Sequence, residues 1–315
     1  MTKPSLSVIV PVYNKLAVLP SVLTALRSQA HDVDLQVLAL DDGSMDGSLE
    51  YLQTLAAEWP ALTVLHDGRN LGPSLRINQA LPLIHTPWVF LMDADAILLA
   101  GALAGLLRLQ ASTRADALHA EIERVESLEE AVKAAPWEDP PARRFEVSDR
   151  PLHTLLKRRG IVRMAWLVGR DCLLKANGAD PGIFIQDESL PLRIARAAGR
   201  LTLVRAVLAC EPPDGSHLSS QSRQTHHDRL LAHLHFRHEC TDLAWADHWR
   251  LTNRCLSAAR RAGRSGLLAS TGSGRLARAY YLRKLGLPWP VAGLLRSCEA
   301  DMNEHVGIRR PELGQ

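Results

Sequence analysis

The chain has 315 residues, enough for one large domain or two smaller ones, and its hydrophobic (46%) and charged (23%) contents are typical of a soluble globular protein. A formal net charge of +3 is too small to indicate a nucleic acid partner. The five cysteines are scattered without a CxxC pair, and neither a signal region nor a run of about 18 apolar residues occurs. These features predict a cytoplasmic protein with reduced thiols and no transmembrane helix.

The first hundred residues alternate strand and helix patterns. Continuous apolar, β-branched runs predict buried strands, and apolar residues at helical spacing predict helices. The predicted strands cover residues 6–14, 35–44, 62–67 and 88–95, and the predicted helices cover 19–30, 48–59 and 72–84. This alternation predicts an α/β fold with a doubly wound, mostly parallel sheet.

The later part of the chain changes character. Residues 99–111 predict a helix and 115–123 a strand, and the charged, Pro-rich segment 125–151 predicts a mobile loop. A strand, turn and helix then cover 160–178, followed by a helix at 187–199 and a strand at 200–210. From about residue 223 the pattern is helical.

Polar side chains follow the predicted strands where each one ends. Tyr13 follows the first strand, Asp42 the second, and Asp93 and Asp95 the fourth. Ligands of doubly wound sheets bind at the carboxyl ends of the strands, so these groups converge on one edge. Two acids at i and i+2 on a strand point the same way, and Mg²⁺ or Mn²⁺ would offset their repulsion. A polar strand end without a metal stays open as the alternative.

Other candidate positions have weaker local signals. Gly72 would let the backbone approach a ligand closely, and Asn78 on the following helix either reaches a ligand or lies on the surface. Asp187 begins a helix, where the helix dipole alone explains an acid. The His-rich segment 226–238 fits no standard zinc spacing, so an exposed helix is the better prediction.

The segment 248–298 contains ten Lys or Arg residues and no Asp or Glu. One interpretation is a dimer surface or a solvated helix. The other is attraction to anionic lipid head groups or to an anionic acceptor. Both stay open, and with them a homodimer and peripheral contact with the inner face of the membrane.

Five motifs together resemble a known family. "SVIVPVYN", "LDDGSMDGS", "NLGPSLRINQA", "LMDAD" and "QDESLPLR" occur in the order seen in family 2 glycosyltransferases with a GT-A fold. The resemblance covers about residues 5 to 210. It implies inverting transfer of a sugar from a nucleotide diphosphate donor, usually a UDP-sugar, with Mg²⁺ or Mn²⁺ as cofactor. We therefore expect a GT-A domain at 1–220, with a nucleotide-sugar half (1–111) and an acceptor half (112–220). A helical C-terminal extension at 221–315, which the resemblance does not cover, is expected from the helical pattern.

The resemblance also implies roles for single residues. Positions that hold or flank the nucleotide are matched by Pro11, Tyr13, Asp42, Gly72 and Asn78. The metal and diphosphate motif is matched by Asp93 and Asp95, with Asp95 as the direct ligand, and a histidine near the diphosphate is matched by His217. Asp187 matches the general base.

Two departures and one absence bear on the activity. Ala96 stands where many members have a third acid, and Gln186 replaces a Glu before the base. The Gln-x-x-Arg-Trp motif of processive synthases does not occur, so we expect addition of one or a few sugars to a saccharide or lipid-linked acceptor of the cell envelope.

Three other classes were weighed. A catalytically inactive GT-A-like binding or scaffold module stays open because of Ala96 and Gln186. A nucleotidylyltransferase needs a Gly-rich loop after the first strand, where "PVYNKLAVLP" has no glycine. A dinucleotide-binding oxidoreductase needs a GxGxxG motif there, which is also missing.

Overall fold

The computed structural model describes residues 3–158, 163–213, 222–268, 273–287, 289–304 and 308–309. Its strands are β1 (Ser5–Val12), β2 (Asp34–Asp41), β3 (Leu62–Leu65), β4 (Trp88–Met92), β5 (Ile97–Leu98), β6 (Ala117–Arg124), β7 (Phe145–Ser148), β8 (Ala165–Gly169) and β9 (Leu201–Glu211). Its α-helices are α1 (Leu19–Ser28), α2 (Ser48–Glu58), α3 (Pro73–Ala80), α4 (Ala102–Thr113), α5 (Leu128–Val132), α6 (Pro151–Lys157), α7 (Arg170–Lys175), α8 (Gln186–Ala197), α9 (Ser222–Glu239), α10 (Trp245–Arg264), α11 (Ser273–Lys284) and α12 (Ala292–Asn303).

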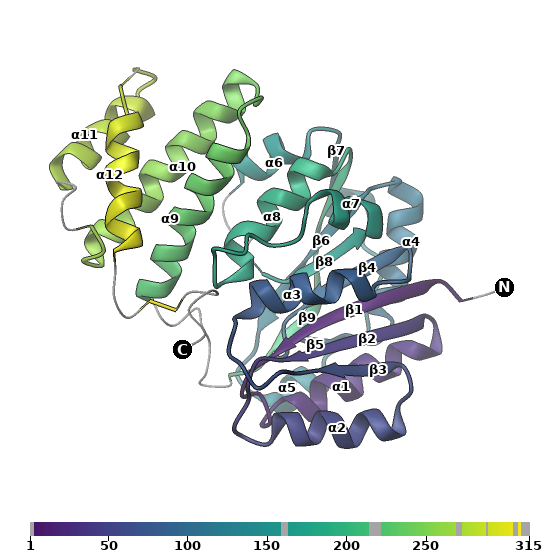
Figure 1. The fold of residues 1–315 in the computed structure, drawn as a ribbon. Helices are drawn as coiled ribbons and strands as arrows, with labels where there is room; N and C mark the ends of the chain where they lie inside the picture. The colour runs from purple at the N-terminus through teal and green to yellow at the C-terminus, as the bar shows by residue number, and fades with distance from the viewer. Residues whose placement is uncertain are drawn as a thin grey trace.

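One sheet forms the centre of the α/β part, with the strand order β3-β2-β1-β4-β8-β6-β9-β5 and with β7 paired to β9 (Figure 1). The four strands β3, β2, β1 and β4 are parallel, as their continuous apolar sequences predict. The second half is mixed: β8 runs antiparallel to both β4 and β6, whereas β6 and β9 are parallel. The predicted fold class is confirmed, and the carboxyl ends of β1, β2 and β4 meet at one edge.

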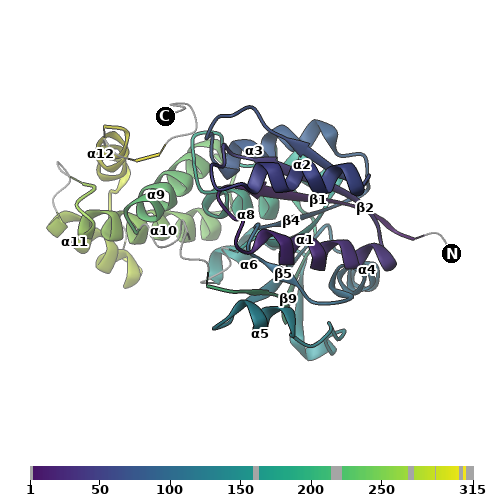
Figure 2. The same cartoon turned by 90° about the horizontal axis from the view of Figure 1, so that it is seen from below.

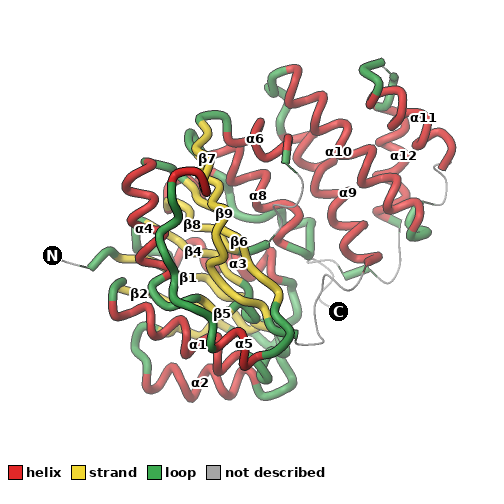
Figure 3. The backbone as a smooth tube through the Cα atoms, turned by 180° about the vertical axis from the view of Figure 1, so that it is seen from behind, coloured by secondary structure: helices red, strands yellow, loops and turns green. Residues whose placement is uncertain are grey.

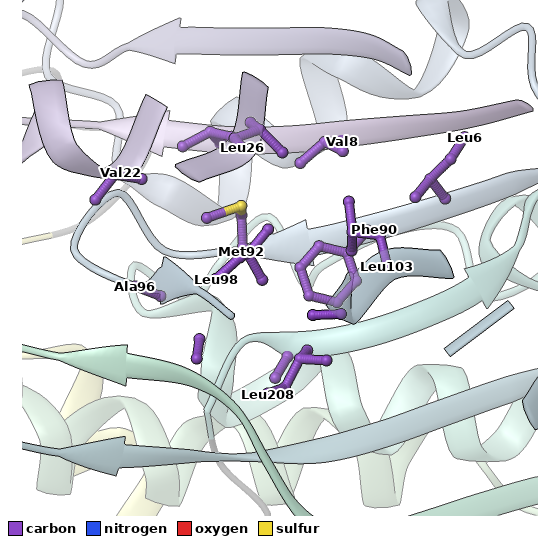
Figure 4. Packing of buried hydrophobic residues seen from close by; sticks show 14 of the residues in the cluster. Leu6, Val8, Val22, Leu26, Phe90, Met92, Ala96, Leu98, Leu103 and Leu208 are labelled. Carbon is purple, nitrogen blue, oxygen red and sulfur yellow. The ribbon is translucent and has the colours of Figure 1, made fainter. Parts of the chain in front are cut away.

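Helices cover both faces of the sheet, and the strand side chains alternate between them. Val8 of β1 packs with Phe90 of β4 in a core that α1 and α4 close with Leu26 and Leu103 (Figure 4). Ile9, the next residue of β1, points to the opposite core, which α3, α7 and α8 cover. Figure 2 shows the sheet between these helical layers. The β1 strand is therefore buried on both faces. This packing holds its carboxyl end at the edge of the sheet where the candidate ligand residues lie.

The segment 125–151 is not the mobile loop that its composition predicts. It contains α5 and β7, and β7 pairs antiparallel with β9. Trp137 is buried, and its backbone N–H donates to the carbonyl of Ala100 at 2.9 Å. The prediction was wrong because its charged and proline residues are local signals, whereas the pairing that orders the segment is with distant residues.

The helices α9 to α12 gather beside α6 and α8 (Figure 3). Phe236 of α9 and Leu251 of α10 pack with Leu155 of α6 and Leu192 of α8 in one apolar cluster. The helical extension is thus joined to the sheet domain through α6 and α8 by a shared core. Within the described part of the chain, none of the helices is both long enough and apolar enough to cross a bilayer.

The His-rich helix α9 is largely buried, so the expectation of an exposed helix was wrong. His227 and His233 are 1% and 7% exposed. His227 Nε2 bonds to the Met302 carbonyl of α12 at 3.3 Å, and His235 Nδ1 bonds to Asp180 at 2.8 Å. These histidines connect elements of the fold, because their ring nitrogens reach polar groups that the apolar packing would leave unsatisfied.

Candidate active site

A cleft of about 360 Å³, called the main cleft below, opens at the carboxyl ends of β1, β2 and β4. Its lining includes Pro11 near the end of β1 and Tyr13 after it, Asp42 after β2, and Asp93 and Asp95 after β4. Residues 184–188, at and just before the start of α8, also line the cleft. The volume is within the range of small-molecule sites, about 300–1,000 Å³, and the position is the one that doubly wound sheets use for ligands.

Asp42 holds the loop that leads into α3. Its Oδ1 accepts hydrogen bonds from the Leu71 N–H at 2.7 Å and from Arg76 Nε at 2.9 Å, and Gly72 N–H donates to Oδ2 at 3.0 Å. Burial raises the pKa of Asp42 above its ordinary value, although the Arg76 hydrogen bond acts in the opposite direction. Since Oδ2 accepts one described bond, Asp42 can still accept a second one there from a ligand.

Gly72 and Asn78, predicted to hold or flank the nucleotide, are not among the residues that line the main cleft. Gly72 has φ of 85°, and a Cβ there would lie 2.5 Å from the Phe184 ring, so the glycine lets Phe184 approach rather than a ligand. Asn78 Nδ2 donates to the Ala179 carbonyl at 2.9 Å, and the Ala179 N–H donates back to Oδ1 at 2.8 Å. Both residues support the walls of the site.

Asp93 and Asp95 lie in a turn after β4, which ends at Met92. Asp93 Oδ1 accepts from Gln186 Nε2 at 2.9 Å, and Asp95 Oδ2 accepts from Lys15 Nζ at 2.7 Å. The expected alignment on one strand face is therefore wrong, although both acids line the cleft. Burial, followed by the charges of Asp95 and Glu211, raises the pKa of Asp93 to about 8.

Asp187 and Glu188 begin α8 but have different surroundings. Glu188 forms a bidentate pair with Arg229, with N–O distances of 2.8 and 2.6 Å. Asp187 Oδ1 is buried and has no hydrogen-bond partner among the described residues. Burial, followed by the charge of Asp93, raises the pKa of Asp187 well above its ordinary value. Of the two, Asp187 has the oxygen available to take up a proton.

Gln186 stands where a glutamate was expected, and its surroundings explain why an amide suits this acidic cleft. Its Nε2 donates to Asp93, whereas its Oε1 is buried without a partner in the described part of the structure. A glutamate here would add a negative charge beside Asp93 and Asp187. The glutamine keeps a hydrogen bond and avoids this repulsion.

Comparison with known proteins identifies the domain. Residues 7–154 match the model of the family described as "Glycosyl transferase family 2". Residues 7–154 therefore match a glycosyl transferase family 2 domain. The sequence is 30% identical over 106 residues to the GalNAc(5)-diNAcBac-PP-undecaprenol beta-1,3-glucosyltransferase of Campylobacter jejuni. That match covers 33% of this chain and 34% of the relative, so the chain spans only about a third of the relative's length.

Solved structures show the same fold over nearly the whole chain. S. aureus TarS 1–349 in complex with UDP has a TM-score of 0.64 at 18% identity, covering 96% of this chain and 88% of TarS. The mannosyltransferase PcManGT from Pyrobaculum calidifontis, in complex with GDP-Man and Mn²⁺, has a TM-score of 0.56 at 16% identity, covering 96% and 87%. The GT-A fold with its helical C-terminal region is therefore confirmed.

The main cleft also contains cations that the sequence interpretation missed. Lys15 contacts Asp95, and Arg163 Nη1 lies 2.9 Å from Glu211 Oε2. Lys15 belongs to the polar turn after β1, so its position was a usable signal. Arg163 follows no strand end and has no comparable local signal. Cations beside the strand ends suit a diphosphate.

Arg309 reaches the family 2 domain from the C-terminal end of the chain. Its guanidinium lies 5.8 Å from the Tyr13 ring centroid and 5.7 Å from that of Phe184. Gln224 of α9 holds its backbone through bonds of 2.8 and 3.1 Å. No local pattern predicts this contact, because it depends on the path of the whole helical extension. The predicted residue His217 lies outside the described residues.

The carboxylates of the family 2 domain fit a metal that a substrate helps to hold. Among the residues that the structure describes, no group of three or more His, Cys, Asp or Glu is arranged to hold a metal ion. Mg²⁺ usually binds one or two carboxylates together with substrate phosphates, and Asp93 and Asp95 can supply these. Burial first, and then the charges of neighbouring acids, raise the pKa values of Asp93 and Asp187, and a bound cation would offset the contribution of those charges.

Proposed function

We propose that the protein is an inverting glycosyltransferase that moves a sugar from a nucleotide diphosphate donor, a UDP-sugar, to an acceptor hydroxyl in cell-envelope saccharide synthesis. One observation carries the proposal: the buried, unpartnered Oδ1 of Asp187 in the main cleft, opposite the acids that follow β4. The glycosyltransferase family match and the TarS structures with UDP and UDP-GlcNAc support the reaction class and the donor.

The donor would bind along the carboxyl ends of the strands. The rings of Tyr13 and Phe184 with the Arg309 guanidinium form a platform suited to stacking a base. Asp42 Oδ2 can accept from a ribose hydroxyl, and Lys15 is placed for the diphosphate. In this assignment the backbone at Pro11 shapes the part of the cleft that would hold the nucleotide base.

Asp95 and Asp93 would hold Mg²⁺ or Mn²⁺, with Asp95 as the direct ligand. A bound ion would neutralise charge that develops on the leaving diphosphate. The Mn²⁺ in the PcManGT complex supports this choice. His217 belongs to the same proposal through the family resemblance.

Asp187 would act as the general base. It takes the proton of the acceptor hydroxyl while the acceptor oxygen bonds to the anomeric carbon and the bond to the diphosphate oxygen breaks. Attack from the face opposite the leaving group inverts that carbon, so no covalent sugar–enzyme intermediate is needed. Burial raises the pKa of Asp187, and a more basic carboxylate accepts a hydroxyl proton more readily.

The acceptor would be a saccharide or a lipid-linked saccharide at the cytoplasmic face of the membrane. The name of the Campylobacter jejuni relative includes a PP-undecaprenol group. On this chain, Trp245 and Leu285 are 76% and 75% exposed. Trp245 stacks on Trp249 at 5.5 Å, and Arg283 lies 3.7 Å from the Trp249 ring centroid, so aromatic and basic groups adjoin as at a membrane interface. Peripheral membrane contact through 248–298 and a homodimer are parts of this proposal.

The first experiment is calorimetric titration of UDP and of GDP, each with and without Mn²⁺. Binding of UDP that depends on Mn²⁺ supports the donor assignment. The second experiment measures UDP release from UDP-sugars with a panel of acceptors. Asp187→Asn should abolish transfer while UDP still binds, and Asp171→Asn, at an exposed position of α7, should leave both unchanged. Folded protein that binds neither nucleotide would refute the proposal and favour the scaffold alternative.

A further inference from the structure

A second cavity of about 400 Å³, called the basic cavity below, lies among α6, α8, α9, α10 and α11. It shares three lining residues with the main cleft: Asp187, Glu188 and Arg229. In Figure 1, α8 lies between the sheet and the C-terminal helices. The wall that separates the two cavities therefore contains the proposed base.

The basic cavity carries a large excess of positive charge. Seven Lys or Arg side chains line it against the two carboxylates of Asp187 and Glu188. Besides Arg229, the cations are Lys157, Arg158, Arg250, Arg254, Arg261 and Lys284. Glu188 compensates Arg229, and Glu146 pairs with Arg158. His233 adds no charge, since burial lowers its pKa to about 4.

Arg254 is the most informative of these cations. Its Nη2 donates to the carbonyl of Leu155 at 2.7 Å and to that of Arg158, and none of the described carboxylates pairs with it. Burial, followed by the charges of Arg229 and Arg261, lowers its pKa. A partly buried cation among like charges is costly unless an anion joins it. The two carbonyls orient the guanidinium without compensating its charge.

We propose that the basic cavity binds a phosphate group of the acceptor, as a phosphomonoester, phosphodiester or diphosphate close to the hydroxyl that is glycosylated. The inference rests on the proposed function and names the chemistry of the acceptor. A donor in the main cleft and an acceptor in the basic cavity would meet at Asp187, which lines both. Guanidinium groups suit phosphate because they donate two parallel hydrogen bonds. Asn253 and Tyr280 in the same lining can bond to saccharide hydroxyls.

Part of the positive charge of the segment 248–298 lies inside the basic cavity. Arg250, Arg254, Arg261 and Lys284 line the cavity rather than an outer surface alone. Since Arg254 is only partly exposed within the helical layer, a flat bilayer surface cannot contact it, whereas a single phosphate group can enter. The concave shape therefore favours an acceptor phosphate over a lipid surface.

The test is calorimetric titration of pyrophosphate into protein already saturated with UDP and Mn²⁺, so that the main cleft is filled. We expect wild-type protein to bind pyrophosphate. Arg254→Gln and the double variant Lys157→Ala/Lys284→Ala should each weaken binding about tenfold or more. Arg264→Gln, on the same helix as Arg254 but outside the cavity, and Lys175→Ala, an exposed lysine of α7, should match wild type.

The lysine variant keeps the test independent of folding, because both lysines are exposed and neither forms an ion pair among the described residues. Absence of pyrophosphate binding to the UDP-saturated protein, or equal weakening by the control variants, overturns the inference while the proposed function stands. Failure of UDP itself to bind refutes the proposed function and removes the inference with it.

Competition experiments identify the source of the phosphate. Displacement of pyrophosphate by phosphatidylcholine vesicles that carry polyprenyl phosphate indicates a lipid carrier. Displacement by soluble glycerol phosphodiesters indicates a phosphodiester polymer. Both outcomes support the proposal. A third outcome overturns the proposal: neither competitor displaces pyrophosphate, and the protein binds phosphatidylglycerol vesicles equally well with and without Arg254→Gln. That result would show a flat membrane-binding patch.

Discussion

Replacing Arg76 by methionine tests whether the ion pair beneath the main cleft stabilises the fold. Arg76 is 2% exposed, and its Nε lies 2.9 Å from the Asp42 carboxylate, which is itself buried. Methionine keeps the apolar stem but leaves the Asp42 charge uncompensated, and breaking a buried pair in this way costs about 3–5 kcal/mol. The second pair, with Asp67, adds at most about 1 kcal/mol because the Asp67 side chain is 38% exposed.

We therefore expect Arg76→Met to lower the free energy of unfolding by about 4 kcal/mol near neutral pH. Urea unfolding followed by tryptophan fluorescence measures it, with Arg69→Met, an exposed arginine of the same loop, as the control. Without Arg76 the folded-state pKa of Asp42 rises further above the unfolded value. The cost is then present at high pH and shrinks as the pH falls and Asp42 takes up a proton.

A double variant isolates the pair itself. If Asp42 and Arg76 depend on each other, Asp42→Asn/Arg76→Met should be more stable than the sum of the single effects by about 1–3 kcal/mol. A loss below about 1 kcal/mol for Arg76→Met, or additive single effects, would show that the pair is not what holds this loop.

Three further predictions follow from single sites. Asp187→Asn should lower the rate of sugar transfer by at least about 10²-fold, measured by UDP release, with UDP affinity unchanged; a small loss of rate would exclude it as the base. Gly72→Ala should lower the free energy of unfolding by about 1–3 kcal/mol and weaken UDP binding, because its Cβ would meet the buried Phe184 ring. The control Gly68→Ala also has a positive φ, of 72°, but open space around the Cβ, so it should cost less and leave UDP binding unchanged. Equal effects of the two variants would refute the steric argument. Burial lowers the pKa of His119 and of His233 to about 4 in the folded state. Below about pH 6.5 these histidines take up protons more readily in the unfolded chain, so the free energy of unfolding should fall by about 2 kcal/mol per histidine by about pH 5. Replacing either one by glutamine should reduce this pH dependence in urea unfolding, and an unchanged pH profile would contradict it.

Much of the sheet domain was predictable, because its signals are local. The apolar run before Tyr13 became β1, and the run before Asp42 became β2. Six of the predicted site residues line the main cleft: Pro11, Tyr13, Asp42, Asp93, Asp95 and Asp187. Parallel strands place their carboxyl ends at one edge, so the order of the motifs was enough to bring these side chains together.

Other features of the site depend on contacts that no local pattern records. Lys15 meets Asp95 across 80 residues, and Gln186 meets Asp93 across 93. The ordered segment 125–151 and the buried helix α9 were mispredicted for the same reason. The charged and proline residues of 125–151 are mostly exposed, but the distant strand β9 pairs with β7 and orders the segment. In α9, His227 and His233 are buried because other helices pack over them.

Local sequence patterns are enough to predict the alternation of strands and helices, the order of the five motifs and the edge of the sheet at which the acids collect. These features follow from the spacing of apolar residues and from short turns, both of which depend only on residues close together in the sequence. The tertiary structure alone decided that Asp187 faces two cavities and that Arg254 lies beside the carbonyl of Leu155, 99 residues earlier. Whether a charge is solvated or buried among like charges depends on which helices pack together, and that is a property of the whole core.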